Sequence, residues 1–111
     1  MVYRPVCYEQ MMKAAETFDV RARRMFGGMG VYTGERMFAF LIGDDIGLKL
    51  SPEDLEKALT IPGAGDIRPE PNAEPLRGYV RLPRQVVENF DQFSYWVERS
   101  ACYVRHKVAS A

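Results

Sequence analysis

The chain has 111 residues, of which 47% are hydrophobic and 27% are charged. This length fits one ordinary domain, and the hydrophobic fraction excludes a disordered chain, so we expect a single domain over residues 1–111. Fifteen basic and fifteen acidic residues give a net charge of zero, which argues against direct DNA binding because nucleic-acid modules carry a basic surface.

The first predicted element is a helix that begins at Pro5, a residue favoured in the first helical turn. Apolar residues recur at helical spacing along one face, and these are Cys7, Met11, Ala14, Ala15 and Phe18. Such a stripe is typical of a helix that packs on a core. We therefore expect a core-facing helix that continues to Phe18.

Three β-prone runs follow, at residues 25–33, 36–42 and 46–50. The separators Gly34-Glu35 and Gly43-Asp44-Asp45 are short and rich in turn residues, which favours an antiparallel meander. In the third run apolar residues alternate with Gly47 and Lys49, so Lys49 is predicted to point outward.

The glycines at the start of the first β-prone run permit two interpretations. Gly27 and Gly28 precede Met29 and Gly30, and consecutive backbone N–H groups in a glycine-rich turn bind anions. Glycine within a strand more often marks a β-bulge or a close backbone approach. We prefer the bulge and keep the anion-binding loop as the alternative.

A second helix is predicted after residue 50. Ser51 is a good N-cap, Pro52 fits the first helical position, and Asp54 is placed to return a hydrogen bond to the cap. Prolines then interrupt residues 62–77, and within this segment we expect only a weak edge strand at residues 66–68.

The chain is predicted to end with a strand at residues 78–82 and a long helix capped by Asp91. Phe93, Trp96, Val97, Ala101 and Val104 recur at helical spacing, so we expect Phe93 and Trp96 to be core anchors. The predicted fold class is α+β: an antiparallel meander sheet of four or five strands, packed with N- and C-terminal helices.

No residue cluster predicts catalysis or metal binding. His106 is the single histidine, and it lies four residues after Cys102, a spacing that suits a weak ligand pair or a nucleophile with its base. Two ligands do not complete a zinc site, and cations near a helix C-terminus are favoured by the helix dipole. We expect no metal, no cofactor and no enzymatic activity.

Neither a signal peptide nor an 18-residue apolar run is visible. We therefore expect a cytoplasmic protein without membrane association, in which Cys7 and Cys102 are reduced.

Several motifs together carry a family resemblance. They are the run from Arg23 to Tyr32, which includes Arg-Arg-Met-Phe-Gly-Gly, the triplet Met37-Phe38-Ala39, the junction Gly47 to Ser51, and Tyr79 to Pro83. In order and spacing the chain resembles the N-terminal domain of the TfoX/Sxy family of competence regulators. This resemblance implies a small bacterial cytoplasmic α+β domain without a cofactor, linked to competence genes together with a transcription activator. Full-length members carry a further helical domain, so we expect a standalone N-terminal domain here.

Two functional classes remain open. The first is a non-enzymatic regulatory or adaptor domain that contacts a transcription-related protein or a second copy of itself. The second is a small-molecule or nucleotide and anion-binding domain, whose candidate binding residues are Arg23, Arg24, Gly27, Gly28 and Lys49. Alternation along a strand allows only one of the two arginines to share the buried face. We expect Arg24 to be structural, with a paired guanidinium, and Arg23 to be available to a partner.

Overall fold

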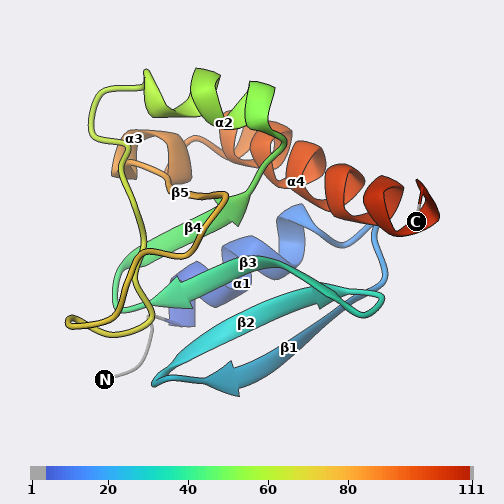
Figure 1. Cartoon of the computed structure of the whole chain (residues 1–111), viewed down its shortest axis with the longest axis horizontal. Helices are drawn as coiled ribbons and strands as arrows, with labels where there is room; N and C mark the ends of the chain where they lie inside the picture. The colour runs from blue at the N-terminus through green and yellow to red at the C-terminus, as the bar shows by residue number, and fades with distance from the viewer. Residues whose placement is uncertain (1–4, 111) are drawn as a thin grey trace.

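The computed structural model describes residues 5–110, with side chains described from residue 8 to residue 105. Its centre is one open antiparallel sheet whose strand order equals the chain order (Figure 1). The strands are β1 (Val20–Met25), β2 (Gly28–Thr33), β3 (Arg36–Ile42), β4 (Asp45–Lys49) and β5 (Tyr79–Arg81). The α+β class and the meander order are therefore confirmed.

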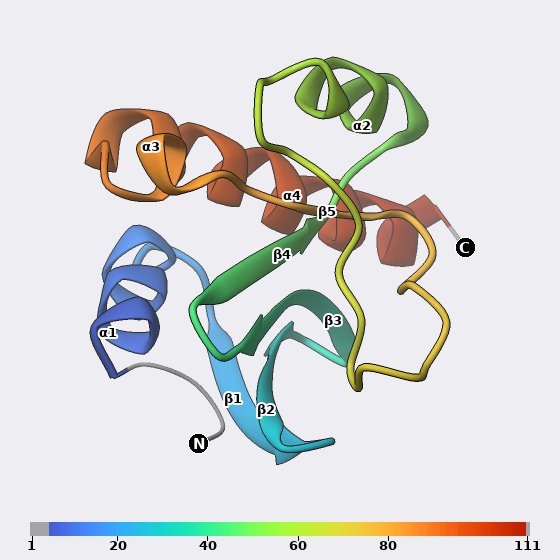
Figure 2. The same cartoon turned by 90° about the vertical axis from the view of Figure 1, so that its left-hand side faces the viewer.

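The helices cover one face of this sheet. They are α1 (Pro5–Ala14), α2 (Pro52–Leu59), α3 (Arg84–Val87) and α4 (Phe90–Ser110). In Figure 2 the sheet lies between α1 and the proline-rich segment of residues 62–77. The main core between sheet and helices includes Met11, Val31, Phe38, Leu48 and Phe93. No helix among the described residues has the length and apolar character needed to cross a bilayer.

The proline-rich segment covers part of the opposite sheet face. Ile67 packs there with Phe40 and Tyr79 in a second, smaller core, and a Cβ on Gly47 would lie only 2.7 Å from an Ile67 methyl. The predicted edge strand at residues 66–68 is wrong, because the backbone pairing is limited to an isolated bridge between Gly65 and Arg81. The nearby prolines lack the N–H donors that a ladder needs, so this segment contributes packing instead of a strand.

The first predicted β-run is also corrected. The chain reverses direction at Phe26-Gly27 and forms the β1–β2 hairpin, so Gly27 lies in a two-residue turn and not in a bulge. The predicted first helix ends earlier than expected, at Ala14. The chain then forms β1, in which three arginines interrupt the alternation of apolar and polar residues. For this reason the sequence pattern did not predict the strand.

The sheet does contain one bulge, located in β3. Val31 pairs with Ala39 whereas Tyr32 pairs with Met37, so Phe38 has no partner on β2. The extra residue lets the neighbours Phe38 and Ala39 both join the main core, while Met37 packs against the smaller one.

Ser100 of α4 completes the hydrogen bonding beside this bulge. Its Oγ lies 2.6 Å from the carbonyl oxygen of Lys49 and 3.0 Å from that of Phe38, where the β3–β4 pairing stops at Ala39 and Leu48. Ser100 is fully buried, so its one hydroxyl hydrogen, shared between these two backbone acceptors, takes the place of water there.

We expect Ser100→Ala to lower the free energy of unfolding by about 1–3 kcal/mol, since it removes a buried hydrogen-bond donor from two carbonyls. Urea denaturation would measure this loss, with the exposed Cys102→Ala as control. Equal stability of both variants would contradict the assigned hydrogen bonds.

The register of α4 confirms one predicted anchor and corrects the other. Phe93 is fully buried together with Val97 and Ala101. Trp96 is only partly buried and packs against the edge of the main core, where its ring meets that of Tyr95 edge-on at 5.1 Å between centroids. Ser100 is also fully buried on this helix face, where the carbonyl oxygens beside the bulge approach the helix.

Candidate functional site

The turn between β1 and β2 holds an aromatic residue in a disfavoured backbone conformation. Phe26 has a φ of 53° and Gly27 a φ of 78°, both in the left-handed region. For a bulky side chain this region costs about 1–2 kcal/mol, and a two-residue hairpin turn prefers Asn-Gly. Nevertheless the Phe26 side chain is 57% exposed, so little burial offsets the strain.

The two glycines of this turn have separate structural reasons. Gly27 requires its positive φ, and a Cβ there would meet no atom within 4 Å. At Gly28 a Cβ would lie 2.3 Å from the carbonyl oxygen of Leu41, a distance that real contacts do not reach. The glycine pair is thus explained by the turn and by the close approach of β2 to β3.

Arginines accompany Phe26 along β1. Arg21, Arg23 and Arg24 are exposed, and the hairpin of residues 20–33 contains no acidic residue. Arg24 pairs in register with Met29 and Arg23 with Gly30. Paired residues share a sheet face, so Arg24 lies on the helix side and Arg23 on the other.

The predicted structural role of Arg24 is not found. Neither Arg23 nor Arg24 forms an ion pair or a side-chain hydrogen bond with any described residue. Arg21, by contrast, donates to the carbonyl oxygen of Gly34 at 2.9 Å. Both arginines are exposed on the border strand of the sheet, so both guanidinium groups remain available to a binding partner.

The structure does not bring Lys49 to this hairpin. Lys49 lies on β4, separated from β1 by β2 and β3, and its stem runs past Gly78, with Cε 3.7 Å from the position of a Cβ there. Of the five predicted binding residues, Arg23, Arg24, Gly27 and Gly28 are therefore neighbours and Lys49 is not. Binding of a ligand by these residues stays a prediction.

The comparison with known families now decides the identity of the fold. The family described as the TfoX N-terminal domain matches residues 12–102, which includes all five strands and the β1–β2 hairpin. The chain belongs to this family. No curated protein matches it.

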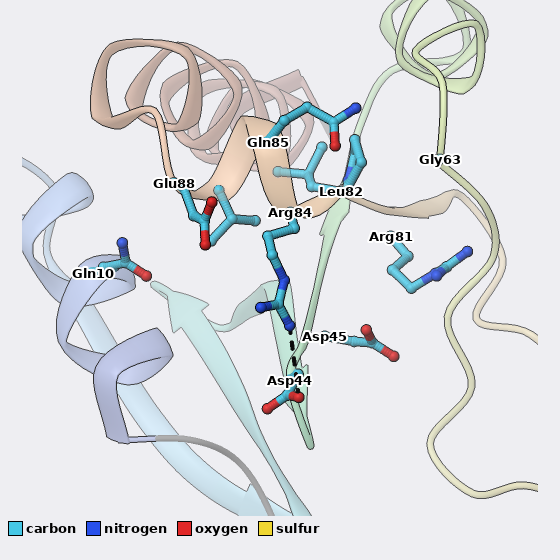
Figure 3. Close-up of a pocket in the computed structure, with 11 residues that line it drawn as sticks. Gln10, Asp44, Asp45, Gly63, Arg81, Leu82, Arg84, Gln85 and Glu88 are labelled. Atoms are coloured by element: carbon cyan, nitrogen blue, oxygen red, sulfur yellow. Dashed lines mark ion pairs between the residues drawn. The ribbon is translucent and has the colours of Figure 1, made fainter.

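The structure of this chain also has a polar cavity that no sequence motif indicated. It measures about 480 Å³ and lies between α1, the β3–β4 turn, β5 and α3 (Figure 3). Arg84 reaches across it toward Asp44, with 3.9 Å between Nη2 and Oδ2. These residues are far apart in the sequence and share no motif, so only the folded chain shows that they meet.

The charged groups of this cavity offer little binding energy. Both side chains of the Arg84–Asp44 pair are more than half exposed, and an exposed ion pair contributes about 0–1 kcal/mol. Arg81 donates to the backbone oxygen of Asp66 and is occupied. We therefore place the candidate site of the domain at the hairpin and not in this cavity.

A stronger ion pair joins α2 to α4. Arg99 donates from Nε and Nη2 to the two carboxylate oxygens of Asp54, at 2.9 and 3.0 Å, and Asp54 is buried. These hydrogen bonds, followed by the negative charge of Asp54, raise the pKa of Arg99 above its ordinary value. Ser51 does cap α2 by accepting from the Asp54 N–H, but the Asp54 carboxylate binds Arg99 instead of returning to the cap.

The cysteine and histidine of α4 are described only in part. Cys102 is exposed and carries a free thiol, whereas the side chains of His106 and Cys7 lie outside the described residues. Among the described residues no group of three potential ligands could hold a metal ion. A ligand or nucleophile role for Cys102 and His106, which the sequence made the less favoured alternative, is therefore untested.

Proposed function

We propose that this domain is a non-enzymatic regulatory or adaptor domain that works through protein contacts at its β1–β2 hairpin. The contact surface consists of Arg23, Arg24 and Phe26, which we call the hairpin tip. One observation carries the proposal: the hairpin exposes a strained Phe26 beside two arginines that form no ion pair with any described side chain.

Stability alone does not account for phenylalanine at this position. The left-handed conformation disfavours it, and its exposure leaves most of the ring in water. Backbone strain that the surrounding structure does not reward is concentrated at functional positions. Aromatic residues and arginine are also the residue types that contribute most to protein interfaces. The hairpin tip thus has the composition of an interface anchor.

Membership of the family adds the biological process to this proposal. The chain belongs to the TfoX N-terminal domain family and resembles competence regulators, and we infer that its partner is a protein that takes part in transcriptional control of competence. The domain would act by holding this partner, and it would perform no chemistry itself.

A pair of matched variants tests the proposal. Phe26→Asn removes the exposed ring from the hairpin, and Leu59→Asn removes another exposed apolar side chain, 48% accessible, from the C-terminal end of α2. The immobilised domain is incubated with an extract of its source cells. We expect a protein that wild type and Leu59→Asn retain and Phe26→Asn loses; identical sets of retained proteins would refute the proposal.

Phe26→Asn should also make the free domain more stable. Asparagine adopts the left-handed region with little cost and suits this turn before Gly27. We expect a gain of about 1 kcal/mol in the free energy of unfolding, measured by urea denaturation. A loss of stability would show that the ring serves the fold, contrary to a role in binding.

The anion-binding alternative predicts a different result. Inorganic phosphate or ATP, titrated into the labelled domain, would shift the backbone amide resonances of residues 23–28. Saturable shifts with both ligands would favour that alternative. Their absence, together with Phe26-dependent retention of a protein, would favour the adaptor function.

A further inference from the structure

The border strand β1 leaves one side of its backbone open, directly beside the hairpin tip. In the described part of the chain β1 pairs only with β2, and Figure 1 shows no labelled element beyond it at the lower border of the sheet. The turn is closed by the pair Met25 and Gly28. Hydrogen-bonded and non-hydrogen-bonded pairs alternate along an antiparallel ladder, and the pair that closes a two-residue turn is hydrogen-bonded. Val20, Ala22 and Arg24 therefore belong to the non-hydrogen-bonded pairs, and their N–H and C=O groups point away from β2.

This border lacks most of the features that usually prevent strand addition. The register with β2 is unbroken over six residue pairs, so no bulge turns the strand away. The sequence Val-Arg-Ala-Arg-Arg-Met contains no proline. Proteins prevent unwanted pairing at border strands with bulges, prolines, charges or a covering segment. Of these four features, β1 itself has only the charges of its arginines.

The arginines of β1 determine the charge of the strand that can pair with its open side. A second copy of β1 would place arginines opposite arginines, which is unfavourable for like charges across strands. Arg23 and Arg24 project on opposite faces of the sheet, as their register partners show. An added strand with carboxylates on both faces would meet both guanidinium groups, and cross-strand pairs of opposite charge are favourable.

We propose that β1 accepts an extended acidic segment of a partner protein by strand addition, paired to the outward backbone groups of Val20, Ala22 and Arg24. This inference rests on the proposed function, since it names how the partner of the hairpin tip is held. Backbone hydrogen bonds supply the affinity and the arginines select the charge. Phe26, at the end of the same strand, then contacts apolar surface of the partner.

A proline variant tests this mode without breaking the sheet. Proline is tolerated at a border strand where its missing N–H faces solvent, which is the situation of Ala22. Ala22→Pro therefore removes the central outward donor, whereas the control Ala22→Ser keeps it. Thermal unfolding of both variants verifies that the fold persists.

The probe is a synthetic peptide of about eight residues in which pairs of glutamates alternate with pairs of valines, so that both faces of the extended peptide carry carboxylates. A peptide with lysines in place of the glutamates is the charge control. We expect the acidic peptide to protect the amides of Ala22 and Arg24 from hydrogen exchange, and Ala22→Pro to weaken binding at least tenfold. Ala22→Ser should bind like wild type, and the lysine peptide should not bind.

Three results would overturn the inference. Equal binding of the acidic peptide by Ala22→Pro and wild type would exclude strand addition. Concentration-dependent protection of the same amides without peptide would assign β1 to a second copy of the chain. Tighter binding of duplex DNA than of the peptide at these amides would assign the arginines to phosphate groups.

The adaptor function and strand addition at β1 can be refuted independently. If the partner retained from the extract depends on Phe26 and is unaffected by Ala22→Pro, the adaptor function stands and strand addition is wrong. If neither variant changes the retained proteins, the adaptor function itself is refuted.

Discussion

Replacing Phe93 with alanine is expected to lower the free energy of unfolding by about 3–5 kcal/mol, the range found for large-to-small changes in a well-packed core. Phe93 is fully buried and belongs to the main core between α4 and the sheet. Removal of the ring leaves a cavity. The surrounding strands and helices are closely packed and can move only a little, so they fill this cavity only in part.

Trp96→Ala is the matched comparison, since tryptophan has the larger side chain. Trp96 is only partly buried at the rim of the same core, so we expect a smaller loss than for Phe93→Ala although more atoms are removed. Urea denaturation of both variants measures the difference. A larger loss for Trp96→Ala would mean that the register of α4 differs from the one described.

The second large effect is expected at Gly28. A methyl group there would overlap the carbonyl oxygen of Leu41 at 2.3 Å, and this neighbour is backbone held by the β2–β3 ladder. Neither strand can yield without losing hydrogen bonds. We therefore expect Gly28→Ala to destabilise the domain by about 3 kcal/mol or more, at the upper end of overpacking effects.

Gly27→Ala provides the contrast within the same turn. No atom lies within 4 Å of the added methyl group, and only the positive φ of 78° is unfavourable. We expect a loss of about 1 kcal/mol, the usual cost of a left-handed residue. Similar losses at both positions would contradict the close β2–β3 approach and would reopen the interpretation of the glycine pair as a ligand loop.

The Arg-Arg-Met-Phe-Gly-Gly element contains residues that shape the fold and residues that do not. The glycines shape the hairpin, Met25 packs against the smaller core, and the residues left without a structural reason are Arg23, Arg24 and Phe26. A binding role is therefore to be sought in those three side chains, and glycine variants would report on folding instead.

The sequence by itself determined the parts of the fold that depend on local order. Gly34-Glu35 and the aspartates after Ile42 lie where short turns must be, so the order of β2, β3 and β4 follows from chain connectivity alone. Ser51 and Pro52 start α2 as expected, because capping is a contact between residues three apart.

Tertiary structure alone decided the features that depend on distant residues. β1 escaped detection because it is a border strand, whose arginines need no buried partner and so break the alternation on which strand prediction relies. The carboxylate of Asp54 accepts from Arg99 and does not bind the N-cap of α2, because α4 brings the Arg99 guanidinium within 2.9 Å of it. Ser100 became buried because a bulge in β3 left carbonyl groups to satisfy. In each case the deciding partner is at least forty residues away or absent, and a local pattern carries no information about it.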